Sequence, residues 1–133
     1  MDARTLQALA EKLFAAVERS DGDAFLACFA PDAVIVQNGG RPRAVSAAAE
    51  HVGNAAPDAA RHTYSDIRRH LFDGGFVEEH TVRSVTASGD VLIRHACVVC
   101  DVDADGLVTQ MREYIDRSPV PTHLMMRNIA SGP

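Results

Sequence analysis

Residues 64–116, which read YSDIRRHLFDGGFVEEHTVRSVTASGDVLIRHACVVCDVDADGLVTQMREYID, decide the fold of this chain. Three short stretches rich in glycine and aspartate divide them, at residues 73–75, 88–90 and 103–106. Such residues favour the tight turns that join antiparallel strands. The segments between the turns are rich in β-branched residues, which favour strands. The stretch therefore predicts an antiparallel meander with strands over residues 64–72, 76–87, 91–102 and 107–116.

The residues ahead of this meander are predicted to be mainly helical. Apolar residues follow the helical spacing between residues 6 and 17, which predicts an amphipathic first helix. Asp21 or Asp23 can cap a short second helix that carries Phe29, and Ser46 can cap a third over residues 47–52. A β-branched run over residues 33–37 predicts one early strand. Helices followed by a meander indicate an α+β fold, with one curved sheet packed against helices.

Length and charge limit the function classes. The 133 residues and 14.3 kDa fit one domain, which we place at residues 1–118, followed by a tail over 119–133. The formal charge of -5 and the lack of a basic tract argue against a nucleic-acid partner. No signal segment or run of eighteen apolar residues is visible, and the three cysteines are too few for a secreted scaffold. We therefore expect a soluble, reduced, cytoplasmic protein without a membrane partner.

The last predicted strand carries an acid on its apolar face. Side chains alternate between the two faces of a strand, so Met111, Glu113 and Ile115 share one face. A carboxylate among apolar neighbours must be paired, solvated in a cavity or kept protonated. The placement of Glu113 is the first indication of a pocket with chemistry in it.

Two histidines on the neighbouring strands are predicted to face the same pocket. We place His80 and His95 on the side of Glu113, because the opposite choice would bury three arginines, namely Arg83, Arg94 and Arg112. An imidazole facing a carboxylate in a cavity can act as a general acid or base near neutral pH. A structural hydrogen-bonded pair explains the same spacing and is the more frequent situation. Tyr64 and Asp66 can reach the same cavity, with a register that the sequence leaves open.

A metal site is not expected. His80, His95 and Glu113 follow no ligand-spacing motif. Cys97 and Cys100 have the spacing of a metal or redox motif, but an odd offset within a strand sends two side chains to opposite faces. Small buried thiols are the better interpretation. The remaining histidines are expected at the surface or in turns; they are His51, His62, His70 and His123.

Four segments resemble the nuclear-transport-factor-2-like superfamily, and in particular its SnoaL-like branch. They are SDGDAF at residues 20–25, FAPDA at 29–33, DGGFVEEH at 73–80 and REYID at 112–116. The resemblance covers roughly residues 4–118. It implies a cone-shaped fold, in which a strongly bent sheet of four to six strands wraps around the helices and encloses a deep pocket. It also implies a homodimer formed through the outer face of the sheet.

The resemblance also argues against two known enzyme mechanisms, because this chain lacks the catalytic residues that they use. Where steroid isomerases of this superfamily carry two aspartates and a tyrosine, this chain has other residues, at Ala15, Gln37 and Val98. Limonene epoxide hydrolases use an Arg-x-Asp pair on the strand where this chain has His80 and Val82, and only their last acid is kept, as Glu113. The standard mechanisms of both enzymes are therefore not expected.

The resemblance leaves two functions open. One is a cofactor-independent acid–base enzyme (an isomerase, cyclase, dehydratase or hydratase) that acts on a small apolar carbonyl or hydroxyl compound, with Glu113 as the base and His80 as its partner. The other is a non-catalytic protein that binds a small apolar molecule or serves as a dimeric scaffold with a vestigial pocket. Fold alone does not choose between them. The residues expected to line the pocket are Tyr64, Asp66, Glu78, His95, Cys97, Met111, Ile115, Phe14 and Phe29.

Overall fold

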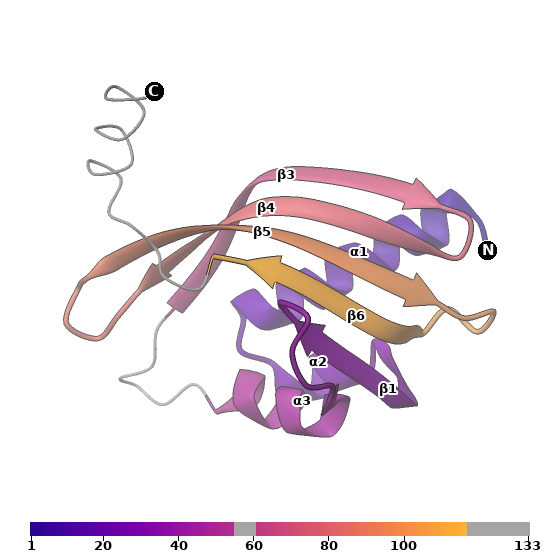
Figure 1. Ribbon diagram of the computed structural model, residues 1–133, viewed down its shortest axis with the longest axis horizontal. Coiled ribbons are helices and arrows are strands. Elements are labelled where there is room, and N and C mark those ends of the chain that lie inside the picture. Colours follow the sequence, from indigo (N-terminus) through magenta and orange to yellow (C-terminus); the bar gives the residue numbers. More distant parts are fainter. Residues whose placement is uncertain (55–60, 117–133) are drawn as a thin grey trace.

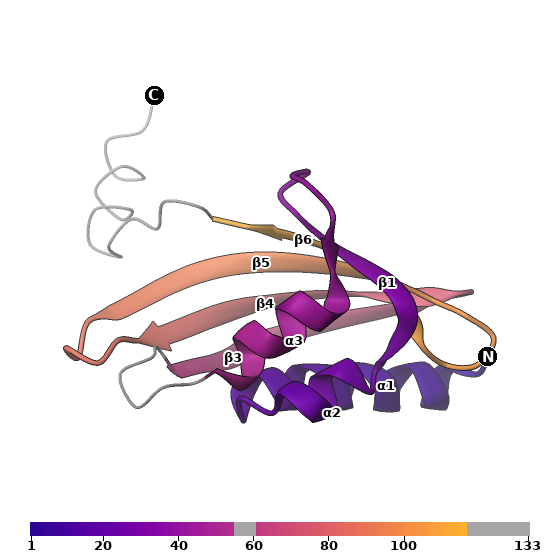
Figure 2. The same cartoon turned by 90° about the horizontal axis from the view of Figure 1, so that it is seen from below.

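A computed structural model describes residues 1–54 and 61–116, and in this part of the chain three helices pack on one side of a six-stranded sheet (Figure 1). The helices are α1 (Ala3–Glu18), α2 (Gly22–Leu26) and α3 (Val45–Gly53). The strands are β1 (Phe29–Gln37), β2 (Arg43–Ala44), β3 (Arg61–Phe72), β4 (Gly75–Val85), β5 (Val91–Val102) and β6 (Val108–Ile115). Figure 2 shows α1 and α2 beneath the curved sheet, with α3 overlapping β3 and β4 in this view. The predicted α+β fold is confirmed.

Aspartates begin the first two helices. The Asp2 carboxylate accepts a hydrogen bond from the Thr5 amide at 2.8 Å, and the Asp21 carboxylate accepts one from the Ala24 amide at 2.9 Å. Both bonds satisfy amides that a helix cannot satisfy itself. The apolar stripe of α1 is buried against the sheet, as its spacing predicts.

Two details at the helix ends differ from the sequence-based expectation. Helix α3 begins at Val45, its N-cap is Ala44, and no side chain caps it, so Ser46 lies inside the helix. Phe29 is the first residue of β1 and does not belong to α2. Helix α3 begins two residues earlier than predicted and α2 ends three residues before Phe29, because local sequence specifies helix boundaries poorly.

The sheet has the strand order β2-β1-β6-β5-β4-β3. The four strands of the predicted meander pair antiparallel with their neighbours in sequence. β1 pairs parallel with β6, so the first long strand lies beside the last one. The result is a mostly antiparallel sheet in which residues 37 and 113 are partners across adjacent strands.

A β-bulge in β3 sets which side chains of that strand face the helices. Ser65 pairs with Thr81 and Arg68 pairs with Glu79, so β3 has one residue more than β4 over this interval. Asp66, inside the bulge, has a positive φ of 52°. The extra residue changes the alternation, and Tyr64 and Arg69 therefore lie on the same face although they are five residues apart.

The main core lies between the helices and the concave face of the sheet. Phe14 of α1 lies edge-on to Phe76 of β4, with ring centroids 6.4 Å apart. In the two described ranges, no helix combines the length and the apolar character that crossing a membrane requires. The predicted tail over 119–133, together with His123, lies outside the described residues.

Candidate functional site

One row of residues on the concave face of the sheet carries polar side chains across five strands. The strand pairing joins Arg69, Glu78, Val98, Glu113 and Gln37 in that order. Directly paired residues point to the same face, so two carboxylates lie in this row with only Val98 between them. The row divides the concave face into a closed, apolar end and an open end.

The open end holds a cavity with a volume of about 340 Å³. Its walls come from the end of α1, the end of α3 and from five strands, namely β1, β3, β4, β5 and β6. Four apolar side chains and eight that carry polar groups surround it. The lining residues are Val17, Ser20, Gln37, His51, Val52, Asn54, His62, Tyr64, Val82, Arg94, Glu113 and Ile115.

Glu113 is held in this cavity by the first long strand. The side-chain amide of Gln37 donates a hydrogen bond of 2.7 Å to Oε1 of Glu113. The next residue, Asn38, forms two hydrogen bonds with the end of β6. Its Nδ2 donates to the Ile115 carbonyl at 3.0 Å, and its Oδ1 accepts from the Ile115 amide at 2.9 Å. Asn38 can do this because it adopts a positive φ of 50°, a conformation that asparagine tolerates. The parallel pairing of β1 with β6 therefore fixes the position of the carboxylate.

Three further polar side chains line the cavity from the opposite side, namely Tyr64, His62 and Arg94. Burial, together with the nearby charge of Glu113, raises the pKa of the Tyr64 phenol, which stays protonated and can donate a hydrogen bond. Burial and the charge of Arg94 lower the pKa of His62. The Nδ1 atom of His62 lies 2.7 Å from the Ser84 hydroxyl. The cavity thus combines one carboxylate with several hydrogen-bond donors.

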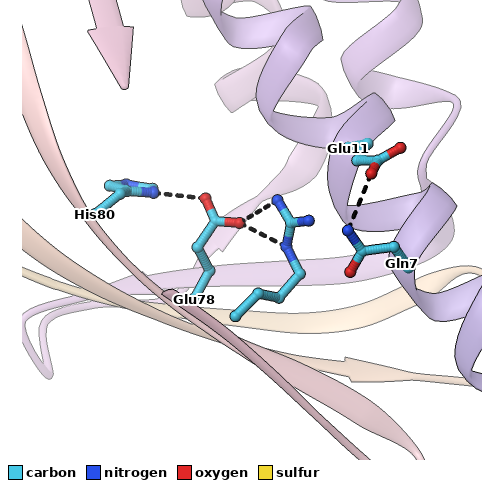
Figure 3. A network of polar contacts seen from close by, with 5 residues as sticks. Gln7, Glu11, Glu78 and His80 are labelled. Carbon is cyan, nitrogen blue, oxygen red and sulfur yellow. Dashed lines mark hydrogen bonds and ion pairs between the residues drawn. The ribbon is translucent and has the colours of Figure 1, made fainter. Parts of the chain in front are cut away.

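A buried ion network lies on the closed side of the cavity (Figure 3). Glu78 is fully buried, and its Oε1 accepts a hydrogen bond of 2.7 Å from Nε of Arg69. Its other oxygen, Oε2, lies 2.6 Å from Nδ1 of His80. The His80 ring stacks on Tyr64, with centroids 4.3 Å apart, and its Nε2 is buried without a hydrogen-bond partner among the described residues. Tyr64 is therefore the link between this network and the cavity.

The expected pairing of His80 with Glu113 differs from the contacts found. His80 is bonded to Glu78, and Glu113 is bonded to Gln37. The reason is spacing: Glu78 lies two residues before His80 on the same face of β4, whereas Glu113 lies two strands away. Glu113 lines the cavity, and His80 lies behind Tyr64.

The placement of His95 and Cys97 on the cavity side needs correction. In the strand register His95 pairs with Thr81 and Cys97 pairs with Glu79, which puts both on the outer face of the sheet. Arg94 lines the cavity in their place. Burying an arginine was the reason to choose the other face, but Arg94 lies at the open end of the sheet, where its charge remains close to solvent.

Asp66 also lies outside the cavity. It borders a hollow at the β3 bulge, where the Thr81 hydroxyl donates to Asp66 at 3.2 Å and lies 3.3 Å from Nδ1 of His95. Of the other residues expected to line the pocket, Tyr64 and Ile115 do so. Three are part of the hydrophobic core instead, namely Phe14, Phe29 and Met111.

Sequence reasoning missed four residues that define the site. Two histidines expected at the surface or in turns, His51 and His62, line the cavity. The sequence argument places Arg94 on the outer face, and it gives Arg69 no role in the site. The signal for Arg69 is its arginine–carboxylate complementarity with Glu78, because the two residues pair directly between the hairpin turn and the bulge. Among the residues that the structure describes, no cluster of three or more histidine, cysteine or acidic side chains could hold a metal ion.

A family model described as a SnoaL-like domain matches residues 10–111 of the chain. Among curated proteins, none is similar enough in sequence to count as a match.

Solved structures with the same fold come from several bacteria. A provisionally named polyketide cyclase from Xanthomonas campestris pv. campestris is 25% identical, with a TM-score of 0.71 over 84% of this chain and 90% of that one. An LEH-like epoxide hydrolase from M. tuberculosis is 20% identical, with a TM-score of 0.74 over 97% and 92%. An NTF2-like protein from Burkholderia xenovorans LB400 is 21% identical, with a TM-score of 0.69 over 87% and 92%.

Proposed function

The chain belongs to the SnoaL-like domain family, and on that premise we propose that it is a cofactor-independent enzyme that moves a proton on a small carbonyl or hydroxyl compound. The observation that carries the proposal is the position of Glu113. Its carboxylate lines a cavity of about 340 Å³ and is oriented by Gln37. The neighbouring walls supply hydrogen-bond donors rather than a second acid.

Glu113 is the proposed base. Its carboxylate takes a proton from the carbon next to the substrate carbonyl, and the electron pair of that C–H bond moves to form an enolate. The protonated Glu113 then returns the proton to a different atom of the substrate, which completes an isomerisation, or closes the cycle after a ring-forming or eliminating step. A positioned carboxylate of this kind contributes about 10²–10⁴-fold to the rate.

Tyr64 is the proposed donor to the developing enolate oxygen. Its raised pKa keeps the phenol protonated over the physiological range, so it can donate a hydrogen bond throughout the reaction. His80 stacks on Tyr64 and is itself fixed by Glu78, which holds the phenol ring in place. In this proposal His80 acts on Tyr64 and does not exchange a proton with Glu113.

The proposal is tested by proton exchange, which requires no knowledge of the natural substrate. A panel of small cyclic and aromatic ketones is incubated with the protein in D₂O, and loss of the α-proton signal is followed by NMR. Wild-type protein should accelerate exchange for at least one ketone, and Glu113→Gln should reduce that acceleration by about 10²-fold or more. Glu79→Gln, on an exposed residue, is the matched control and should leave the rate unchanged.

Two outcomes would contradict the proposal. One is exchange that is equally fast in Glu113→Gln. The other is a ketone that binds to the wild-type protein without any accelerated exchange, which would favour the non-catalytic binding function. Thermal unfolding of each variant verifies that a lost rate does not come from a lost fold.

A further inference from the structure

Arg94 lies at the opposite end of the cavity from the proposed base. In the strand register Tyr64, Val82 and Arg94 form one row across β3, β4 and β5 on the concave face. The last pair between β5 and β6 joins Ala96 with Ile115, so Arg94 lies beyond the end of β6. All of Arg94's neighbours in this row line the cavity, and Arg94 lines it as well.

Among the described residues, Arg94 has no partner for its guanidinium. Its Nε atom is buried, and no group in residues 1–54 or 61–116 forms a hydrogen bond with it. The contrast with two other arginines is clear, because Arg69 is paired with Glu78 and Arg112 is paired with Asp101. Within residues 1–54 and 61–116, no carboxylate forms an ion pair with Arg94. A buried donor of this kind requires an acceptor, and the described part of the chain supplies none.

Arg94 supplies the positive charge at its end of the cavity. His51 and His62 line the same cavity, and burial and the charge of Arg94 lower the pKa of His62, which favours its neutral form. Glu113 is the one acid among the lining residues that the structure describes, and its Oε1 is already engaged by Gln37. Along β5, Arg94 is four residues from Val98, the partner of Glu113, which corresponds to roughly 13 Å of strand. The cavity therefore has a cationic end and a separate carboxylate.

We propose that Arg94 binds a carboxylate group of the ligand, so that the natural ligand is a small organic acid. A guanidinium presents two parallel N–H donors that match the two oxygens of a carboxylate. The cavity volume of about 340 Å³ and the apolar side chains Val17, Val52 and Val82 limit the ligand to a compact, mostly apolar acid. The further step, that the reactive carbon of this acid lies at Glu113, rests on the proposed function.

Matched acids and amides test the proposal. The probes are 4-phenylbutanoate with 4-phenylbutanamide, and 2-oxocyclohexane carboxylate with its amide, and their dissociation constants are measured by NMR titration. Wild-type protein is expected to bind an acid about 10-fold or more tightly than its amide. Arg94→Gln should remove this preference, because it mainly weakens binding of the acid. Arg83→Gln, which changes an exposed arginine on the outer face, should keep the preference.

Arg94→Lys provides the second variant, because it keeps the charge and loses the planar pair of donors. It should fold and retain only part of the preference. The proposal is overturned if the wild-type protein binds the amides as tightly as the acids, if it binds neither, or if Arg94→Gln keeps the preference. Glu113→Gln separates this proposal from the catalytic one. If Glu113→Gln still prefers acids over amides, the ligand class is supported. If the wild-type protein shows no proton exchange in the same experiments, the proposed enzyme activity is contradicted while the ligand class stands.

Discussion

Replacing Arg69 by methionine is expected to lower the free energy of unfolding by about 3–5 kcal/mol. The side chains of Arg69 and Glu78 are 12% and 0% exposed, so neither charge has much access to water. Methionine retains the apolar stem of Arg69 but leaves the Glu78 carboxylate buried with His80 as its remaining polar side-chain partner. The loss would be a large part of the 5–15 kcal/mol that is usual for a domain. The exposed pair of Arg112 and Asp101 provides a contrast, since its side chains are 29% and 44% exposed.

Urea unfolding followed by circular dichroism at pH 7 measures these differences. Arg112→Met, the same substitution at the exposed pair, should cost about 0–1 kcal/mol. The double variant Arg69→Met/Glu78→Gln should be more stable than the sum of its single variants predicts, because it removes both members of the pair. Equal losses for the two methionine variants, or strict additivity in the double variant, would refute the argument that burial makes the Arg69–Glu78 pair important.

Three further predictions concern single positions. Asp21→Ala should cost about 1 kcal/mol in urea unfolding, because it removes the only side-chain bond seen at the start of α2 in the described structure; no loss would mean that α2 is held by its packing alone. Gly75→Ala should cost about 1–3 kcal/mol, because its Cβ would overlap the Cys100 carbonyl oxygen, whereas Gly53→Ala meets only ordinary contacts and should be tolerated in the same assay. The folded-state pKa of His62 is below its ordinary value of 6.5, so as the pH falls the unfolded chain binds a proton at His62 before the folded chain does. The contribution of His62 to stability is therefore lost as the pH falls from about 6.5 through the folded-state pKa. His62→Gln should therefore flatten the pH dependence of thermal stability between pH 7 and 5, and an unchanged slope would contradict the assignment.

Local sequence was sufficient for the fold class and the meander because its signals agree with one another. The Asp-Gly turns fix the meander, and the spacing of apolar residues fixes α1. The parallel pairing of β1 with β6 has no local signal, since it depends on where the helices carry the chain. The β3 bulge also has no local sequence signal, because Asp66 adopts the positive φ that a glycine would otherwise indicate.

The site was less predictable because each strand offers two faces. Alternation correctly grouped Met111 with Glu113 and Ile115, and Glu78 with His80. It could not decide which face of β5 is concave, and the rule that arginines avoid the inside chose His95 over Arg94. That rule fails where a sheet ends at an open cavity, because a long charged side chain can line the wall there.

The hydrogen bond between Gln37 and Glu113 has a consequence for the synthesis of the protein, because it joins residues 76 positions apart. A ribosome adds about 5–20 residues per second, so the carboxylate is made roughly 4–15 s after the amide that orients it. During that interval β1 can pair with β2 but lacks its parallel partner, and its free edge is open to other chains. The cavity is therefore among the last parts of the molecule that can form. Nascent chains that stop before β6 should depend on chaperones in a way that the finished domain does not.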